Sequence, residues 1–173
     1  LTQAQSRKRS IADLQDYYEF VRRCGYIFTG LKNNTMSRDQ SWQFAHLGQM
    51  LERADKTARL IDVKYFLLLP RGQVIDSPYD TVQWGAVLKS VDALEMYRQQ
   101  YHSINYRDVT EFLLFSTAFP RSVSFTLESA AFSLGMLSGD AATPSVAMQE
   151  MKTLIGSIQG SSADDIIASG LHE

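Results

Sequence analysis

The chain has 173 residues, of which 45% are apolar and 21% are charged, and its formal net charge is -2 at pH 7. This length is enough for one domain with a core of its own. A chain so close to neutral has no electrostatic footprint for nucleic acid. The longest continuous apolar run, YFLLLP at 65–70, is far shorter than the ~18 residues of a membrane span. We therefore predict a protein that binds neither nucleic acid nor a membrane.

Cysteine usage bears on the cellular compartment. Cys24 is the only cysteine, so an internal disulfide is impossible, which fits a reducing cytoplasm. It lies in an apolar helical run between Val21 and Phe28, and we expect a buried, inert thiol. The prediction is a cytoplasmic protein.

Helical periodicity covers the chain, whereas strand signals are nearly absent, since no sustained alternation and no Asn-Gly or Asp-Gly turn occurs. The first predicted helix follows Ser10, a good N-cap, and ends at the KNNT break at 32–35. Its apolar residues share one stripe: Ile11, Leu14, Tyr18, Val21 and Phe28.

The second predicted helix is the longest and runs from a capping box at Ser37 and Gln40 to Pro70. At ~1.5 Å per residue, its roughly 32 residues would span ~48 Å, so we predict that it forms the central post of a bundle. Its apolar residues recur at spacings of three and four, as in a heptad seam: Phe44, Leu47, Leu51, Ala54, Ala58, Ile61, Tyr65 and Leu68.

The rest of the chain predicts further helices after a loop at 71–80. Pro120 and Pro144 suit the first turn of two of them. The predicted ranges are 81–101, 106–119, 120–139, 144–158 and a last short helix at 163–169. We therefore predict an all-α fold, an antiparallel bundle of about six helices around a long central helix, in a single domain spanning 1–173.

Charges on the second helix allow two interpretations. In the first they form the solvent face of a structural helix, where Asp55–Arg59 and Glu52–Lys56 are acid-before-base pairs at i,i+4 that stabilise by ~0.2–0.5 kcal/mol each. In the second the helix packs on more than one side, because apolar residues also lie off the seam. Desolvated charges must then pair, shift their pKa or serve a site.

One flank of this helix carries His46, Arg53 and Thr57. His46 and Arg53 together could hold an anion, although a lone histidine on such a flank is also typical of a hydrogen-bonded structural residue. No metal site is predicted, because the chain has no Glu-x-x-His and no cysteine pair. No phosphate-loop or nucleophile motif predicts a cofactor either.

Four segments resemble the bacterial alpha-E family: GLKNNTMSRDQSWQFAHLGQMLERADKTARLIDVKYFLLLP, QWGAVLKSVDALEMYRQQY, VTEFLLFSTAFPRSV and GLHE. The resemblance implies an all-helical fold with a Glu-Arg motif, matched here by Glu52-Arg53. Family members usually accompany an ATP-grasp type protein and often a transglutaminase-like protease, which implies a pathway that makes or modifies peptide or amide bonds. Full-length members are longer, so we expect this chain to be the C-terminal half of such a protein, cut at both ends.

The resemblance leaves three hypotheses open, and no oligomeric state is predicted. The leading one is an accessory component that binds the partner enzyme or its peptide substrate, which predicts an exposed apolar patch. The second is an enzyme with Glu52 as acid/base and Arg53 as anion clamp in a shared pocket; its further binding residues would be His46, Asp55, Arg59, Asp62 and Arg121. The third is a structural bundle, in which a buried pair would join the motif to Asp92, Glu95, Glu111, Arg121 or Glu128.

Overall fold

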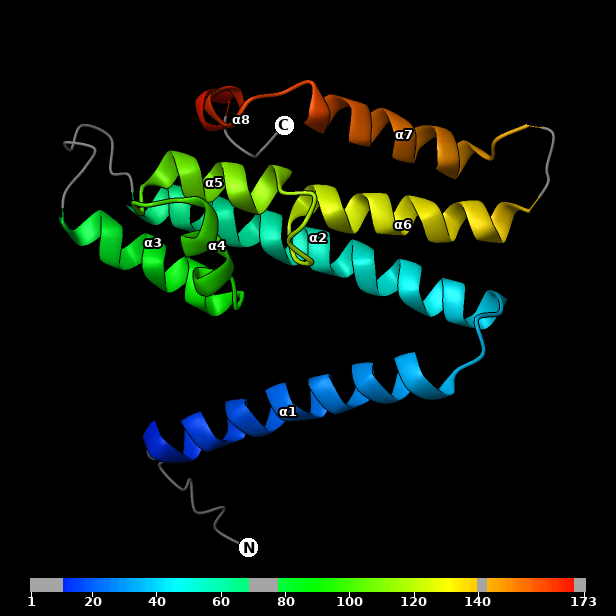
Figure 1. The fold of residues 1–173 in the computed structure, drawn as a ribbon, viewed down its shortest axis with the longest axis horizontal. Coiled ribbons are helices and arrows are strands. Elements are labelled where there is room, and N and C mark those ends of the chain that lie inside the picture. Colours follow the sequence, from blue (N-terminus) through cyan, green and yellow to red (C-terminus); the bar gives the residue numbers. More distant parts are fainter. Residues whose placement is uncertain (1–10, 69–77, 140–142, 170–173) are drawn as a thin grey trace, which may run out of the picture. The chain divides into compact units, whose positions relative to one another are not determined.

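The computed structural model describes residues 11–68, 78–139 and 143–169, which form eight α-helices and no strand (Figure 1). This confirms the all-α prediction. The helices are α1 (Ile11–Thr35), α2 (Gln40–Leu68), α3 (Pro78–Ser90), α4 (Leu94–Gln100), α5 (Tyr106–Phe115), α6 (Val123–Ser138), α7 (Val146–Gln159) and α8 (Ala163–Ser169).

Two compact units make up the chain, Leu1–Trp42 and Gln43–Glu173, and each is described by itself. None of the described helices is long and apolar enough to cross a membrane. The predicted loop at 71–80 is wrong at residues 78–80, which form the first turn of α3. Other sequence predictions lie outside the described residues: the rest of that loop, the helix end at Pro70, and the seam side chains of Tyr65 and Leu68.

In the first unit, the residue that caps α2 differs from the predicted one. Asp39 caps α2, since its Oδ1 accepts a hydrogen bond from the Trp42 amide at 3.1 Å, so the predicted capping box at Ser37 is wrong. The guanidinium of Arg38 lies 4.1 Å from the centre of the Trp42 ring, and Lys32 Nζ lies 5.5 Å from it. These cation–π contacts stabilise the turn between the helices.

Helix α1 carries its apolar residues on the surface. Tyr18, Val21 and Phe28, three members of the predicted stripe, are all exposed. Cys24 is exposed as well, so the prediction of a buried thiol is wrong. The predictions failed because large apolar residues occur around most of α1. Apolar periodicity shows which residues share a face of a helix, but it does not show whether another element covers that face.

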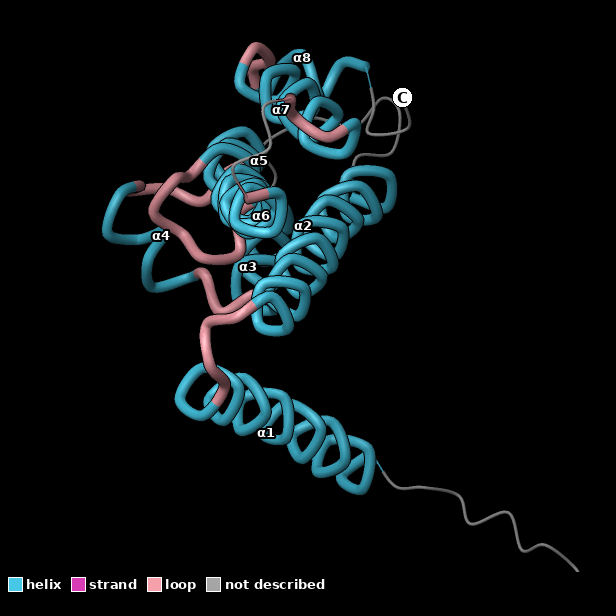
Figure 2. The backbone as a smooth tube through the Cα atoms, turned by 90° about the vertical axis from the view of Figure 1, so that its right-hand side faces the viewer, coloured by secondary structure: helices cyan, strands magenta, loops and turns pink. Residues whose placement is uncertain are grey.

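In the second unit, α5 and α6 follow each other end to end alongside α2 (Figures 1 and 2). Helix α7 packs on α6, α8 packs on α5, and α3 packs on α5 and α4. Half of α5 is buried, more than its one-sided periodicity requires, because it has neighbours on several sides: its buried residues are Val109, Thr110, Phe112, Leu113 and Leu114.

An aromatic cluster joins α4, α5 and the loop after α5. The Phe112 ring centre lies 5.5 Å from that of Tyr97 and 5.0 Å from that of Phe119. Tyr101 stacks on Tyr97 at 4.7 Å. Tyr97 is fully buried, and its hydroxyl donates to the Ser103 carbonyl at 2.8 Å. Burial also raises the pKa of Tyr97, so the phenol stays neutral and keeps donating.

The helix predicted at 81–101 is divided in two, so its predicted continuity is wrong. Asp92 has a φ of 54°, a conformation that Asp tolerates better than most residues. The Ala93 amide donates to the Leu88 carbonyl at 2.8 Å and the Asp92 amide donates to the Lys89 carbonyl at 3.1 Å. This is a Schellman motif, which ends α3 although the apolar periodicity continues through it.

Side-chain caps, rather than prolines, set where the later helices begin. Asn105 caps α5, and Ser122 and Ser145 cap α6 and α7 by accepting backbone N–H hydrogen bonds. Helices α6 and α7 therefore begin three and two residues after the predicted Pro120 and Pro144 starts.

The packing of the aromatic cluster leads to a prediction about the free energy of unfolding. We expect Phe112→Ala to lower the free energy of unfolding by about 3–5 kcal/mol, because it leaves a cavity among packed rings. Phe132 is the matched control, since it is exposed on α6, and Phe132→Ala should cost less than about 0.5 kcal/mol. Urea denaturation of both variants measures the difference, and equal losses would contradict the packing described.

Candidate functional site

The buried face of α2 is rotated from the predicted seam. Ala54 and Ile61 are buried as predicted, but Phe44 and Leu51 are exposed. Among residues 40–63 of α2, the other buried positions are Gln43, Met50 and Thr57. At ~100° per residue, the buried face lies roughly 60° from the predicted one, toward the flank that carries Arg53.

Two side chains on this flank hold the loop at 116–122, which joins α5 to α6. Arg53 Nη1 donates to the Pro120 carbonyl at 3.0 Å, and Thr57 Oγ1 donates to the Arg121 carbonyl at 2.8 Å. Residues four apart on a helix lie one above the other, so the two donors match two successive carbonyls. Helix α2 is thereby fixed against the junction of α5 and α6.

The loop is also tied internally. The Ser122 hydroxyl donates to the Ser116 carbonyl while accepting from the Phe125 amide at 3.1 Å. The Phe119 amide donates to Ser116 Oγ at 3.2 Å. With Ser122 fully buried, the loop has few ways to move without breaking these bonds, so it presents its two carbonyls to α2 in a fixed geometry.

Arg121 brings a second guanidinium close to Arg53. Burial lowers the pKa of Arg53, and the positive charge of Arg121 lowers it further. Arg121 Nη2 pairs with Asp92 Oδ2 at 3.3 Å, which supplies a compensating negative charge. Arginine stays protonated at neutral pH, so both guanidiniums are charged. Such a pair is chemically suited to a carboxylate or a phosphate.

Glu52 lies apart from this arrangement. It is exposed, and it forms no hydrogen bond or ion pair with any residue of the described parts of the chain. Adjacent helical residues point ~100° apart, so Glu52 faces outward where Arg53 faces the loop. The predicted Glu52–Lys56 pair is not formed within 11–68, whereas Arg59 pairs with Asp55 at 2.9 Å and lowers the pKa of that carboxyl by hydrogen bonding.

The other predicted site residues contact different parts of the fold. His46 Nδ1 lies 2.9 Å from the Ser133 hydroxyl of α6, a fully buried group, which fits a structural hydrogen bond. His46 and Arg53 thus engage different partners, one on α6 and one on the loop. Asp62 is half-buried; the hydrogen bond from Arg59 to Asp55 raises the pKa of Arg59, and the charge of Asp62 adds a smaller increase. The catalytic and binding roles of all these residues stay predictions.

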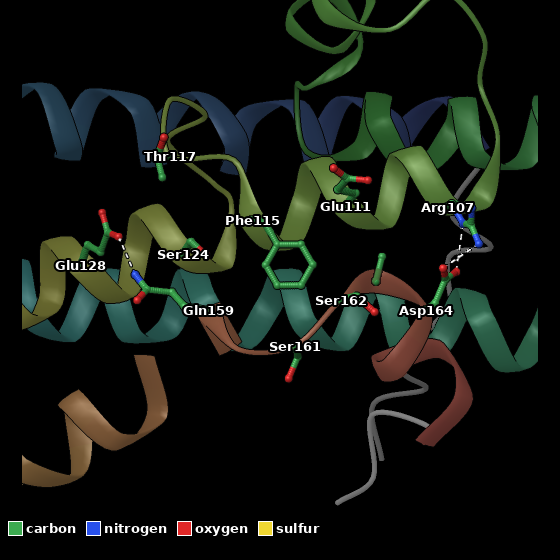
Figure 3. Close-up of a pocket in the computed structure, with 11 residues that line it drawn as sticks. Arg107, Glu111, Phe115, Thr117, Ser124, Glu128, Gln159, Ser161, Ser162 and Asp164 are labelled. Atoms are coloured by element: carbon green, nitrogen blue, oxygen red, sulfur yellow. Dashed lines mark hydrogen bonds and ion pairs between the residues drawn. The ribbon is translucent and has the colours of Figure 1, made fainter. Parts of the chain in front are cut away.

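A pocket that the sequence did not predict lies between α5, α6 and the α7–α8 connection (Figure 3). Its volume is about 480 Å³, and none of the predicted site residues lines it. No sequence motif could have found it, because its residues come from separate helices. They are Arg107, Glu111, Phe115, Thr117, Ser124, Glu128, Gln159, Ser161, Ser162, Ala163 and Asp164.

The chain matches the model of a known protein family. The model of a family described as "Alpha-E: A predicted alpha-helical domain with a conserved ER motif" matches residues 2–173. The chain belongs to the Alpha-E family. Glu52-Arg53 is the one Glu-Arg pair in the sequence, it matches the motif named in that description, and we call it the Alpha-E motif. No curated protein and no solved structure was found to match.

The two residues of the Alpha-E motif should differ in their effect on stability. We expect Arg53→Gln to lower the free energy of unfolding by about 1–2 kcal/mol, because the Pro120 carbonyl loses a charged donor. Glu52→Gln should change it by less than about 0.5 kcal/mol. Urea unfolding at pH 7 measures both, and losses of similar size would contradict the assignment of Arg53 alone to the architecture.

The hydrogen bond from Thr57 to the loop at 116–122 leads to a second prediction about stability. Thr57→Val keeps the shape but leaves the Arg121 carbonyl without its donor, at an expected loss of about 1–3 kcal/mol. Thr153, exposed on α7, is the control for a threonine whose hydroxyl bonds its own helix, and Thr153→Val should have little effect. If both donors hold one loop, combining Thr57→Val with Arg53→Gln should be non-additive by more than about 0.5 kcal/mol. Strict additivity would show that they act independently.

Proposed function

We propose that this chain is a noncatalytic, accessory component of a system that forms or modifies peptide or amide bonds. In this role it binds the ATP-grasp type protein of that system through α1, and a transglutaminase-like protein is a further candidate partner. The observation that carries the proposal is the apolar surface of α1. Eight large side chains are at least 48% exposed there: Tyr17, Tyr18, Phe20, Val21, Tyr26, Ile27, Phe28 and Leu31.

Composition makes this surface suited to a protein partner. Extensive exposed apolar surface of this kind marks interaction sites in soluble proteins. Five of the eight side chains are aromatic, and aromatic residues are enriched in the centres of protein interfaces. Charged groups of both signs on the same helix, including Glu19 and Arg23, would form a polar rim that gives specificity.

The Alpha-E motif is compatible with the same role. Arg53 is engaged in holding the loop at 116–122, while Glu52 offers an exposed carboxylate to a basic side chain of a partner. The enzyme hypothesis, with Glu52 as acid/base, stays a second prediction. The closeness of Arg53 and Arg121 favours it, because two guanidiniums could clamp an anionic substrate.

Phe28 and Phe132 provide a matched test, since both rings are 67% exposed, one on α1 and one on α6. We expect Phe28→Ser to weaken binding of the purified ATP-grasp type protein at least tenfold, because an aromatic anchor at an interface contributes strongly. Phe132→Ser should leave the Kd unchanged. Isothermal titration calorimetry measures both.

Two results would overturn the proposal. One is an unchanged Kd for Phe28→Ser and for Phe20→Ser, with helix content retained by circular dichroism. The other is a loss of melting temperature in Phe28→Ser as large as that in Phe112→Ala. That loss would show that α1 packs against the rest of its own chain rather than against a partner.

A further inference from the structure

We infer that the pocket between α5, α6 and the α7–α8 connection binds a primary ammonium group on an apolar stem, the chemistry of a lysine side chain or a linear diamine. The inference goes beyond the partner-binding role of α1, because every residue that lines the pocket lies in the second unit. A volume of about 480 Å³ is within the range of small-molecule sites.

Charge is the first argument for a cationic ligand. Asp164 is already neutralised by Arg107, whose Nε and Nη2 donate to its two carboxylate oxygens at 2.9 and 2.6 Å. Glu111 and Glu128 have no ion pair with any described residue, and Glu128 receives only a 3.4 Å hydrogen bond from Gln159. The lining therefore holds two uncompensated carboxylates, which favour a bound cation.

A largely buried serine whose hydroxyl has no partner among the described residues also favours a bound ligand. Ser124 lines the pocket and is only 8% exposed, yet its hydroxyl makes no hydrogen bond with the residues that the structure describes. The hydroxyl is therefore open to the pocket and free to bind a ligand N–H. Figure 3 shows Ser124 on the same side of the pocket as Glu128 and Gln159, and this is the side where we place the ammonium.

Phe115 supplies the apolar part of the site. In the view of Figure 3 its ring lies between the side formed by Ser124 and Glu128 and the side formed by Glu111. An alkyl stem can pack on the ring, and an ammonium near its face gains a cation–π attraction. The Arg107–Asp164 ion pair joins α5 to α8 at the end of the pocket away from Glu128 (Figure 3).

A metal ion is the other cation to consider. Within 11–68, 78–139 and 143–169, no three His, Cys, Asp or Glu side chains come together as a metal-binding group. Two separated carboxylates, one aromatic ring and several neutral donors and acceptors instead match an organic cation. The chemistry of the pocket therefore favours an amine.

Titration of the whole chain with small amines tests the inference. The probes are Nα-acetyl-lysine N-methylamide, its uncharged counterpart Nα-acetyl-norleucine N-methylamide, and 1,5-diaminopentane. We expect saturable one-to-one shifts of the Phe115 and Ser124 amides in ¹H–¹⁵N spectra with an amine but not with the norleucine compound. Saturation by the lysine compound indicates a peptide side chain as the source of the ammonium, and saturation by the diamine alone indicates a free diamine. Absence of saturation by either amine overturns the inference.

Variants then locate the site. Glu128→Gln should weaken the Kd of either amine at least fivefold, and Glu111→Gln, on the other side of Phe115, should weaken the Kd of 1,5-diaminopentane, which carries a second ammonium. Glu150→Gln, at an exposed position of α7 outside the pocket, should leave the Kd of both amines unchanged. Equal weakening by Glu150→Gln overturns the inference, because it would show diffuse attraction by surface charge. If a pocket variant fails to fold, the localised shifts in the parent chain decide the question.

Partner binding through α1 and amine binding in the pocket can be disproved independently of each other. Phe28→Ser changes α1 only, so amine binding should be unaffected by it even if partner binding is lost. In the same way, Glu128→Gln should leave the affinity for the ATP-grasp type protein unchanged.

Discussion

The turn from α5 into α6 leaves two successive backbone carbonyls, those of Pro120 and Arg121, that need donors. Helix α2 provides both, from Arg53 and Thr57, and this requirement fixes how α2 is rotated about its axis. With that flank turned toward the loop, Phe44 and other seam residues on the opposite flank are left exposed. Glu52, one position before Arg53, must then face outward.

The same junction organises the rest of the second unit. Because α5 and α6 follow each other end to end, α7 can pack on one and α8 on the other, and the connection at 160–162 crosses between them (Figure 1). Arg107 and Asp164 join the far end of this arrangement. The pocket lies beneath that crossing, so its position is a consequence of the topology and needs no dedicated loop.

Sequence periodicity predicted the existence of the helices well because an apolar repeat of three and four residues is a local property. It could not place the rotation of α2, since the partner of Thr57 lies 64 positions away along the chain. It also continued through Asp92, where a left-handed residue ends α3 while the apolar pattern continues. The different surroundings of Arg53 and Glu52 depend on contacts between residues far apart in the sequence, and so does the position of the pocket. No local pattern encodes such contacts.

The Alpha-E motif joins two adjacent residues whose surroundings differ, and this affects how its substitutions are interpreted. Arg53 holds the Pro120 carbonyl, Ser122 caps α6 two residues later, and Ser124 lies in the first turn of that helix. A change at Arg53 can therefore move the wall of the pocket without Arg53 touching a ligand there. Loss of function in an Arg53 variant would not by itself make Arg53 catalytic, because displacement of Ser124 predicts the same loss. Only an effect that persists while the loop at 116–122 stays in place would assign chemistry to the motif.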